Sequence, residues 1–271
     1  MKKTIIVAIT LFITVVFMSC EESGETPTPT NPTPSPTTTT GTLLLKFDNI
    51  VGNQDLKRNF TYINPVTNED FQVYLCNYFI SNVKLKTTEG KEYAVPQDES
   101  YFLVSEGSEE SQNIKIPNVP FGSYSEITFT IGIDSTRSAA GLTNPPKGLL
   151  SGVNQGMYWS WNTGYIFFMF EGTSSLLKGN HQDGEDFMYH IGGYSGAINN
   201  IRKKTYSLST KAVVSATSTP EIGFKTDLLK VFNGKNQLRI AKNSVVMFDP
   251  YSVEIMANIE QAISLDNIKN P

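Results

Sequence analysis

Residue types that carry common enzyme chemistry are scarce in this 271-residue chain, which has two histidines and two cysteines. The chain contains no HExxH pattern, no zinc-type cysteine cluster, no GxSxG elbow and no phosphate-binding glycine loop. Composition alone leaves a Ser–His–acid triad open, but no nucleophile–base pair stands out, so we expect a non-enzymatic protein. The formal net charge is −4 without a basic cluster, which makes nucleic acid a poor candidate partner.

The few cysteines also bear on the compartment. Residues 1–19 have a basic start, an apolar run and a small residue at the end, which predicts an export signal. Ser19 directly before Cys20 resembles a bacterial lipobox, so we expect Cys20 to carry lipid and to become the mature N-terminus, although Phe17 departs from the usual leucine. An ordinary signal peptide with a chance cysteine is the alternative. Cys76 is then the one remaining thiol, which excludes an internal disulfide and favours a small buried hydrophobe.

Residues 20–41 are expected to tether the domain to a membrane through the lipid anchor. Glutamates crowd the five residues behind Cys20, and such a patch resembles the surface-export signal of lipoproteins in some Gram-negative bacteria; a solvated acidic spacer is the alternative. From Thr26 to Thr40 the chain is almost only Thr and Pro, which favours an extended, semi-rigid segment. We therefore expect an outer-membrane lipoprotein, facing the periplasm or the cell surface, with residues 42–271 as one monomeric domain.

The pattern of the remaining chain predicts a mainly β fold. Apolar and polar residues alternate from Leu43 to Phe47, and again from Glu126 to Ile133, as expected of strands with one buried face. The segment from Asp134 to Gln155 has no periodicity and is interpreted as a long loop. Residues 252–264 have convincing helical character. These features predict an antiparallel β-sandwich with long loops and a little helix near the C-terminus.

The most aromatic stretch of the chain runs from Gly156 to Gly172 and contains both tryptophans. Its second half, Tyr165 to Phe170, is apolar at every position, which favours a strand buried on both faces. Trp159 and Trp161 are two residues apart, so in an extended chain their rings point to one side. A central core strand whose aromatics only pack is the simpler interpretation.

Candidate metal ligands are few and mostly soft. His190 and Met188 share one face of the predicted strand from Phe187 to Ile191, and Met157 and Met169 lie within the aromatic stretch. Thioether and imidazole groups match Cu(I), and imidazole also suits Cu(II). Buried methionines are more often packing, and a lone strand histidine is more often a hydrogen-bonded structural residue. Spacing by itself does not bring these groups together.

Four pieces of the sequence together resemble the MbnP-like family of copper-binding proteins. Spaced in the family's order, they are Tyr78-Phe79-Ile80-Ser81-Asn82-Val83, Phe129-Thr130-Ile131-Gly132-Ile133-Asp134, Gly156-Met157-Tyr158-Trp159-Ser160-Trp161 with Gly164-Tyr165 and Glu171-Gly172, and Tyr189-His190-Ile191-Gly192-Gly193. The resemblance implies a β-sandwich that binds copper through histidines and through kynurenine, an oxidised tryptophan made by a partner dihaem peroxidase-type enzyme. Carried over by position, it makes His190 the histidine ligand and Trp159 or Trp161 the modified residue.

One position departs from the family pattern. Relatives often have a histidine two residues after the first-strand phenylalanine, whereas here Phe47 is followed by Asp48 and Asn49. His181, in a polar loop, is an uncertain substitute, and an amide oxygen is a poor Cu(I) ligand. The chain is therefore expected to bind copper, with Asn49 as the weak position of the site. The alternative is a surface interaction or glycan-binding module that keeps the scaffold without a working metal site.

Overall fold

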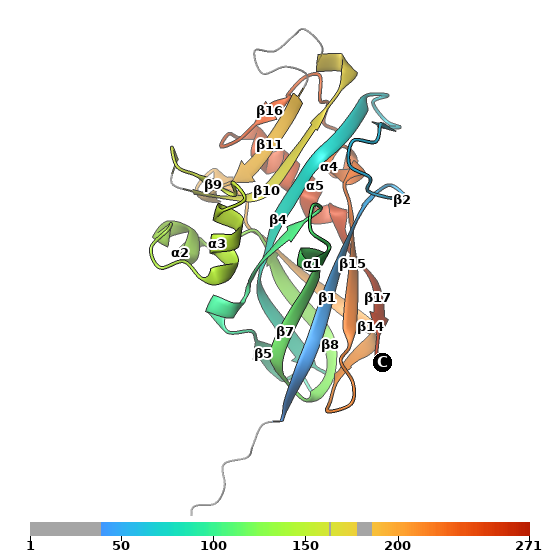
Figure 1. Ribbon diagram of the computed structural model, residues 1–271, viewed down its shortest axis with the longest axis vertical. Helices are drawn as coiled ribbons and strands as arrows, with labels where there is room; N and C mark the ends of the chain where they lie inside the picture. The colour runs from blue at the N-terminus through green and yellow to red at the C-terminus, as the bar shows by residue number, and fades with distance from the viewer. Residues whose placement is uncertain (1–38, 163, 178–185) are drawn as a thin grey trace, which may run out of the picture. The chain divides into compact units, whose positions relative to one another are not determined.

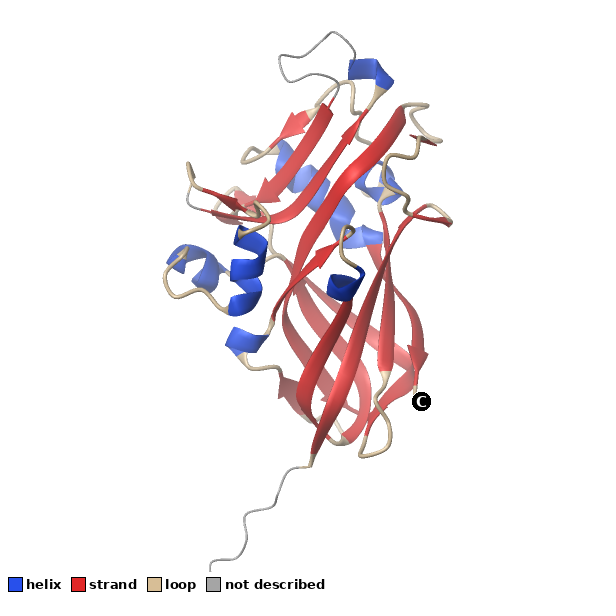
Figure 2. Ribbon diagram, in the orientation of Figure 1, coloured by secondary structure: helices blue, strands red, loops and turns tan. Residues whose placement is uncertain are grey.

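Strands make up most of the regular structure in the computed structural model, which describes residues 39–162, 164–177 and 186–271 (Figures 1 and 2). The two largest sheets face each other and enclose one hydrophobic core. The predicted mainly β sandwich is therefore confirmed. Two positions discussed above, Cys20 and His181, lie outside the described residues.

The smaller of these two sheets carries the first strand of the domain. Its strands are, in spatial order, β17 (Ile263–Lys269), β15 (Glu221–Asp227), β1 (Thr40–Val51) and β2 (Gln54–Asp55), with β7 (Asn113–Pro120) also paired to β1. The β1–β15 ladder is parallel, and the others in this sheet are antiparallel. The alternation predicted from Leu43 to Phe47 is confirmed, because Leu43, Leu45 and Phe47 are fully buried.

The larger sheet carries the aromatic stretch. Its spatial order is β14 (Arg202–Val214), β8 (Gly122–Ile131), β4 (Asp70–Thr87), β10 (Gly164–Thr173), β11 (Asp186–Gly192) and β16 (Val245–Val246). Four short strands pair with β4 or β10: β3 (Tyr62–Ile63), β5 (Glu92–Ala94), β6 (Tyr101–Ser105) and β9 (Tyr158–Trp159). A separate hairpin joins β12 (Tyr194–Ser195) to β13 (Ile198–Asn199). As predicted, Tyr165 to Phe170 is buried at every position of β10.

Short helices lie around the sheets, and two of them correct an expectation. The helices are α1 (Glu109–Gln112), α2 (Ser135–Ala140), α3 (Lys147–Val153), α4 (Leu229–Asn233) and α5 (Tyr251–Ala262), with 3-10 turns η1 (Gln97–Glu99) and η2 (Ser175–Leu177). The segment interpreted as a long loop therefore folds into α2 and α3. The Asp134 side chain accepts a hydrogen bond from the Arg137 backbone N–H and caps α2, and Pro146 precedes α3.

The core between the two large sheets is built from aromatic rings. Phe47 of β1 stacks on Phe224 of β15 with ring centroids 5.1 Å apart, and its edge meets Phe129 and Tyr78 across the sandwich. Tyr78 in turn stacks on Phe168 of β10. Large interlocking rings on the inner faces fix the register of the strands, because a shift of one residue would turn every side chain of a strand to the opposite face of its sheet.

The outer face of the larger sheet is partly covered by the segment that contains α2, α3 and β9 (Figure 1). Asp134 receives a hydrogen bond of 2.6 Å from the Tyr101 hydroxyl, which ties the start of this segment to β6. Gly132 has φ +103°, and a Cβ there would lie 2.7 Å from a ring carbon of Phe167. The family-like piece from Phe129 to Asp134 thus helps to hold this covering segment on the sheet.

Candidate functional site

Four side chains, those of Met169, Glu171, Met188 and His190, lie together on the outer face of β10 and β11. Met169 pairs directly with His190 across the ladder, and Glu171 pairs directly with Met188. Directly opposed side chains in an antiparallel pair have Cβ atoms about 5 Å apart, so all four can meet. The structure therefore brings together His190, Met169 and Met188, which sequence spacing could not do. We refer to these four residues as the His190 cluster.

Glu171 holds the imidazole of His190. The distance between His190 Nε2 and Glu171 Oε1 is 2.6 Å, and both side chains are mostly buried, with 15% and 17% of their surface exposed. The hydrogen bond from His190 lowers the pKa of the Glu171 carboxyl, although burial acts in the opposite direction. With the proton on Nε2, His190 donates to Glu171 and its Nδ1 keeps a free lone pair.

Tyr74 of β4 completes the surroundings of the carboxylate. Its hydroxyl lies near the Glu171 and Asp186 carboxylates, and the pKa of Tyr74 is raised, first by burial and then by the nearby negative charge of Glu171. Tyr74 therefore remains a donor at neutral pH and helps to keep Glu171 ionised. Asn77, which pairs with Met169 on the other side of β10, is also buried here.

Trp159 lies beside the His190 cluster. Residues 188, 190 and 192 alternate onto the same face of β11, and a Cβ on Gly192 would lie 2.7 Å from Cζ3 of the Trp159 ring. The glycine at this position leaves the space that the indole occupies. Trp159 is 5% exposed, and its buried Nε1 has no hydrogen-bond partner among the described residues.

The other two candidates of the aromatic stretch lie differently. The Trp161 ring has its centroid 5.7 Å from that of Trp159, but Trp161 is 66% exposed because it follows the two-residue strand β9. Met157 is fully buried, and its carbonyl oxygen accepts a hydrogen bond from the backbone N–H of Ile166. Neither residue belongs to the cross-strand pairs of the His190 cluster.

Asn49 lies on the other side of the larger sheet. It accepts a hydrogen bond of 2.9 Å from the Tyr78 hydroxyl, and its amide donates to Glu106 at 2.9 Å. Tyr78 follows Asn77 in β4, so the two side chains point to opposite faces, and it is Asn77 that shares the face of Met169 and His190. The structure thus does not bring Asn49 together with His190.

Within residues 39–162, 164–177 and 186–271, no group of three or more His, Cys, Asp or Glu side chains could hold a metal ion. In the same part of the chain, no helix is long and apolar enough to cross a membrane. Because the described residues contain no such group of three metal ligands, a metal held at the His190 cluster would rely on thioether sulfur beside the imidazole. Cu(I) prefers such ligands.

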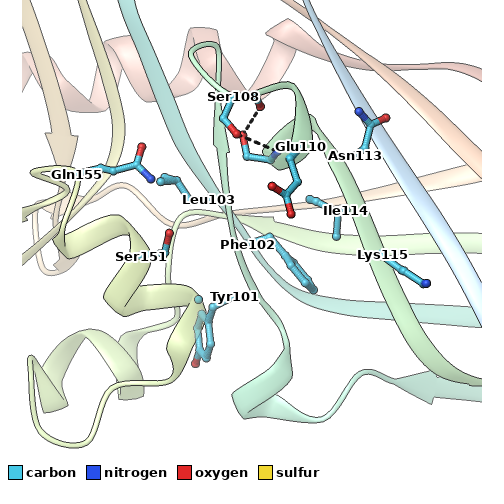
Figure 3. Close-up of a pocket in the computed structure, with 12 residues that line it drawn as sticks. Tyr101, Phe102, Leu103, Ser108, Glu110, Asn113, Ile114, Lys115, Ser151 and Gln155 are labelled. Atoms are coloured by element: carbon cyan, nitrogen blue, oxygen red, sulfur yellow. Dashed lines mark hydrogen bonds between the residues drawn. The ribbon is translucent and has the colours of Figure 1, made fainter.

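The surface cavities among the described residues include two that are not lined by the His190 cluster. The larger has a volume of about 460 Å³ and lies between β6, α1, β7 and α3, with Phe102 at its centre and hydroxyl, amide and charged side chains around it (Figure 3). The smaller has a volume of about 160 Å³ and is lined by Trp159, Asn162, Gly164, Gly193, Tyr194, Ser195 and Phe248. Neither cavity is lined by His190.

Glu171 and Tyr74 are the residues that sequence reasoning missed. Glu171 is the single charged residue between Gly156 and Gly172, and an isolated acid in a buried strand needs a partner. That signal was readable from the sequence. The identity of the partner depends on how β10 pairs with β11, which the sequence does not reveal.

Comparisons with known proteins identify a family for most of the chain. The family model described as MbnP matches residues 40–248. Among solved structures, MbnP from Methylosinus trichosporium is similar, with 14% sequence identity over 77% of this chain and 81% of that chain, and a TM-score of 0.47. We transfer no residue from this distant likeness. A search of curated proteins gave no match.

Proposed function

Because this chain belongs to the MbnP family, we propose that it is a non-enzymatic copper-binding protein whose site is the His190 cluster. The observation that carries the proposal is the direct pairing of Met169 with His190 next to the pair of Met188 and Glu171. Two thioethers and one imidazole on one sheet face match the ligands that Cu(I) prefers. In this proposal the protein binds or presents copper and does not catalyse the reaction of a substrate.

The residues fit such a site in their roles as well as in their types. His190 would bind copper through its imidazole. Met169 and Met188 would contribute neighbouring thioether sulfur atoms, because copper prefers soft donors. Glu171 orients the imidazole by accepting its Nε2 proton, as carboxylates commonly do for metal-binding histidines. Burial of Met169 and the nearby Trp159 ring keeps water away from one side of the cluster.

The second part of the proposal is that Trp159 is the residue converted to kynurenine. Its ring lies over Gly192 beside His190, and its buried Nε1 has no partner among the residues that the structure describes, so the unmodified indole leaves a donor unsatisfied there. In this conversion a four-electron oxidation breaks the indole C2–C3 bond and adds one oxygen atom to each carbon, and water then hydrolyses the resulting N-formyl group and releases the lost ring carbon as formate. Hydrogen peroxide, reduced to water at a dihaem peroxidase-type partner, would be the oxidant.

Copper binding is tested by titrating the secreted chain with Cu(I) in the presence of a competing chelator. We expect a Kd below about 1 µM, which corresponds to about −8 kcal/mol, and a loss of at least about tenfold for His190→Ala. Replacing Met169 and Met188 together with leucine, which preserves volume, should also weaken binding. Met256→Leu in α5 is the matched control, and it should bind like the unmodified chain. Equal affinity of the His190→Ala variant would refute the site.

The modification is tested by mass. Native protein should give a peptide containing Trp159 that differs in mass from the same peptide of protein made without the partner. Fragmentation should place the change on Trp159. Identical peptides from both sources would contradict the modification and leave the copper test unaffected.

The proposed location is the outer membrane, to which the chain is anchored through lipid on Cys20. Cells that produce the full chain should contain it in the membrane fraction, and Cys20→Ala should release it to the soluble extracytoplasmic fraction. Cys76→Ala is the control that removes the other cysteine. If Cys20→Ala stays with the membrane to the same extent as the unmodified chain, the lipid anchor is refuted.

A further inference from the structure

A cluster of aromatic rings reaches the surface next to Trp159. Trp161 is 66% exposed and Phe248 is 44% exposed, and each ring contacts Trp159, with centroid distances of 5.7 Å and 6.4 Å. Large exposed aromatics are uncommon on soluble domains and mark places where something binds. Because both rings rest on a buried tryptophan, they are fixed in place rather than loosely extended.

The smaller cavity described above opens within this cluster. Around its volume of about 160 Å³, the polar side chains are Asn162, Tyr194 and Ser195, and no lining residue in the described part of the chain is charged. One lining position requires glycine: Gly193 has φ +103°, and a Cβ there would meet the Ile198 carbonyl oxygen at 2.5 Å and Phe248 at 3.0 Å. We call the cavity together with Trp161 the Trp161 pocket.

The chemistry of this lining selects a particular class of ligand. Aromatic faces attract the apolar C–H faces of a sugar ring, and amide and hydroxyl groups at the edge can exchange hydrogen bonds with its hydroxyls. An anionic ligand would find no cation among the lining residues, and a cationic ligand would find no carboxylate. The cavity is smaller than the usual pocket for a drug-sized molecule, which fits one ring of a longer chain.

We propose that the Trp161 pocket is a binding subsite for one neutral hexose ring of a glycan. The ring would stack on Trp161 and Phe248, and Asn162, Tyr194 and Ser195 would contact its hydroxyls. The proposed copper ligands His190, Met169 and Met188 do not line the pocket, although Trp159 does, so glycan binding does not require a bound copper ion. It would let a lipid-anchored protein attach to neutral polysaccharide.

The experiment measures binding of cellohexaose, mannohexaose and maltohexaose to the mature chain by saturation-transfer NMR and calorimetry. We expect binding of at least one hexose oligomer, with transfer strongest to the C–H protons of the sugar. Trp161→Ala should weaken it by about tenfold or more, as removal of a central aromatic residue usually does, and Phe248→Ala should weaken it less. Trp161→Phe should retain much of the affinity, because it keeps an aromatic face.

Controls separate this site from the other two regions. Leu150→Ala removes an exposed apolar side chain of α3, and His190→Ala removes the copper ligand; both should leave glycan binding unchanged. Phe102→Ala tests the larger cavity of Figure 3. The proposal is overturned if none of the hexose oligomers binds, if Trp161→Ala binds as tightly as the unmodified chain, or if Phe102→Ala alone abolishes binding. Failure of the copper titration would not affect this result.

Discussion

Glu171 decides what the imidazole of His190 can do. A histidine on a strand face can rotate and can offer either ring nitrogen, whereas a hydrogen bond of 2.6 Å to a carboxylate fixes both the rotamer and the proton. The Tyr74 hydroxyl of β4 lies near the same carboxylate and also favours its ionised form, so residues of β4, β10 and β11 meet at this point. The three residues form a chain of contacts that ends at the one nitrogen free to bind a metal.

Replacing Glu171 with glutamine should weaken Cu(I) binding by about 10- to 100-fold without removing a ligand, because groups that orient metal-binding histidines typically contribute that much. Competitive chelator titration measures the effect. Exposed Glu92 provides the control, since Glu92→Gln lies on β5 away from the cluster. An unchanged affinity of Glu171→Gln would show that His190 needs no orienting carboxylate.

The same pair should make stability depend on pH. The pKa of Glu171 is lowered from its ordinary value of 4.5, chiefly by the hydrogen bond with His190, so the ionised carboxylate stabilises the fold relative to the unfolded chain. This contribution is complete above about pH 4.5 and disappears as pH falls through the lower pKa of the folded state.

Denaturant unfolding should therefore show Glu171→Gln less stable than the unmodified chain by about 1–2 kcal/mol at pH 7. The difference should shrink when both are compared near pH 3. A difference that is as large at pH 3 as at pH 7 would mean that packing, not charge, accounts for the loss.

At the scale of elements, the sequence predicts the strands but not the helices of the segment that covers them. Alternation of period two identified β1 and β8, and the continuous apolar run identified β10, because each pattern follows from which faces are buried. Helices α2 and α3 have six and seven residues, which is too short for a helical period to emerge. Their start signals, Asp134 and Pro146, were present but lay among other turn-forming residues.

Asp134 is the residue that joins this covering segment to the sheet. Asp134→Ala should lower the free energy of unfolding by about 1–2 kcal/mol, because α2 loses its cap and Tyr101 loses its acceptor. Asp134→Asn should lose much less, since an amide oxygen can still cap the helix. Thermal or denaturant unfolding measures both variants. Equal losses for alanine and asparagine would indicate that the carboxylate charge, rather than the cap, is what matters.

At the scale of the whole molecule, the sequence could place residues on strand faces but could not say which strands would be neighbours. The faces of Met188 and His190 were predicted correctly from alternation. Their partners Glu171 and Met169 follow only from the β10–β11 register. For Asn49, family resemblance suggested a place in the metal site. The fold instead places it between the two sheets, where it contacts Tyr78 and Glu106.

Asn49→Ala should therefore destabilise the sandwich without affecting copper. Its loss leaves Glu106 without one donor, and the pKa of that carboxyl is already raised by burial, so a cost of about 1–3 kcal/mol is expected. Cu(I) affinity should match that of the unmodified chain. Exposed Asn154→Ala is the control for stability. A fall in copper affinity like that of His190→Ala would place both residues in one site.

In protein made without the partner, in which Trp159 remains an indole, the contact between the two tryptophans gives the molecule its own optical reporter. No other tryptophan is present, and one ring is 5% exposed while its neighbour, 5.7 Å away, is 66% exposed. The buried indole should emit at shorter wavelength than the exposed one, because water relaxes around an exposed excited state. Quenching at the blue edge would then report events beside His190, and a shift at the red edge would report a ligand stacked on Trp161. A single emission spectrum can thus follow occupancy of two different surfaces at once.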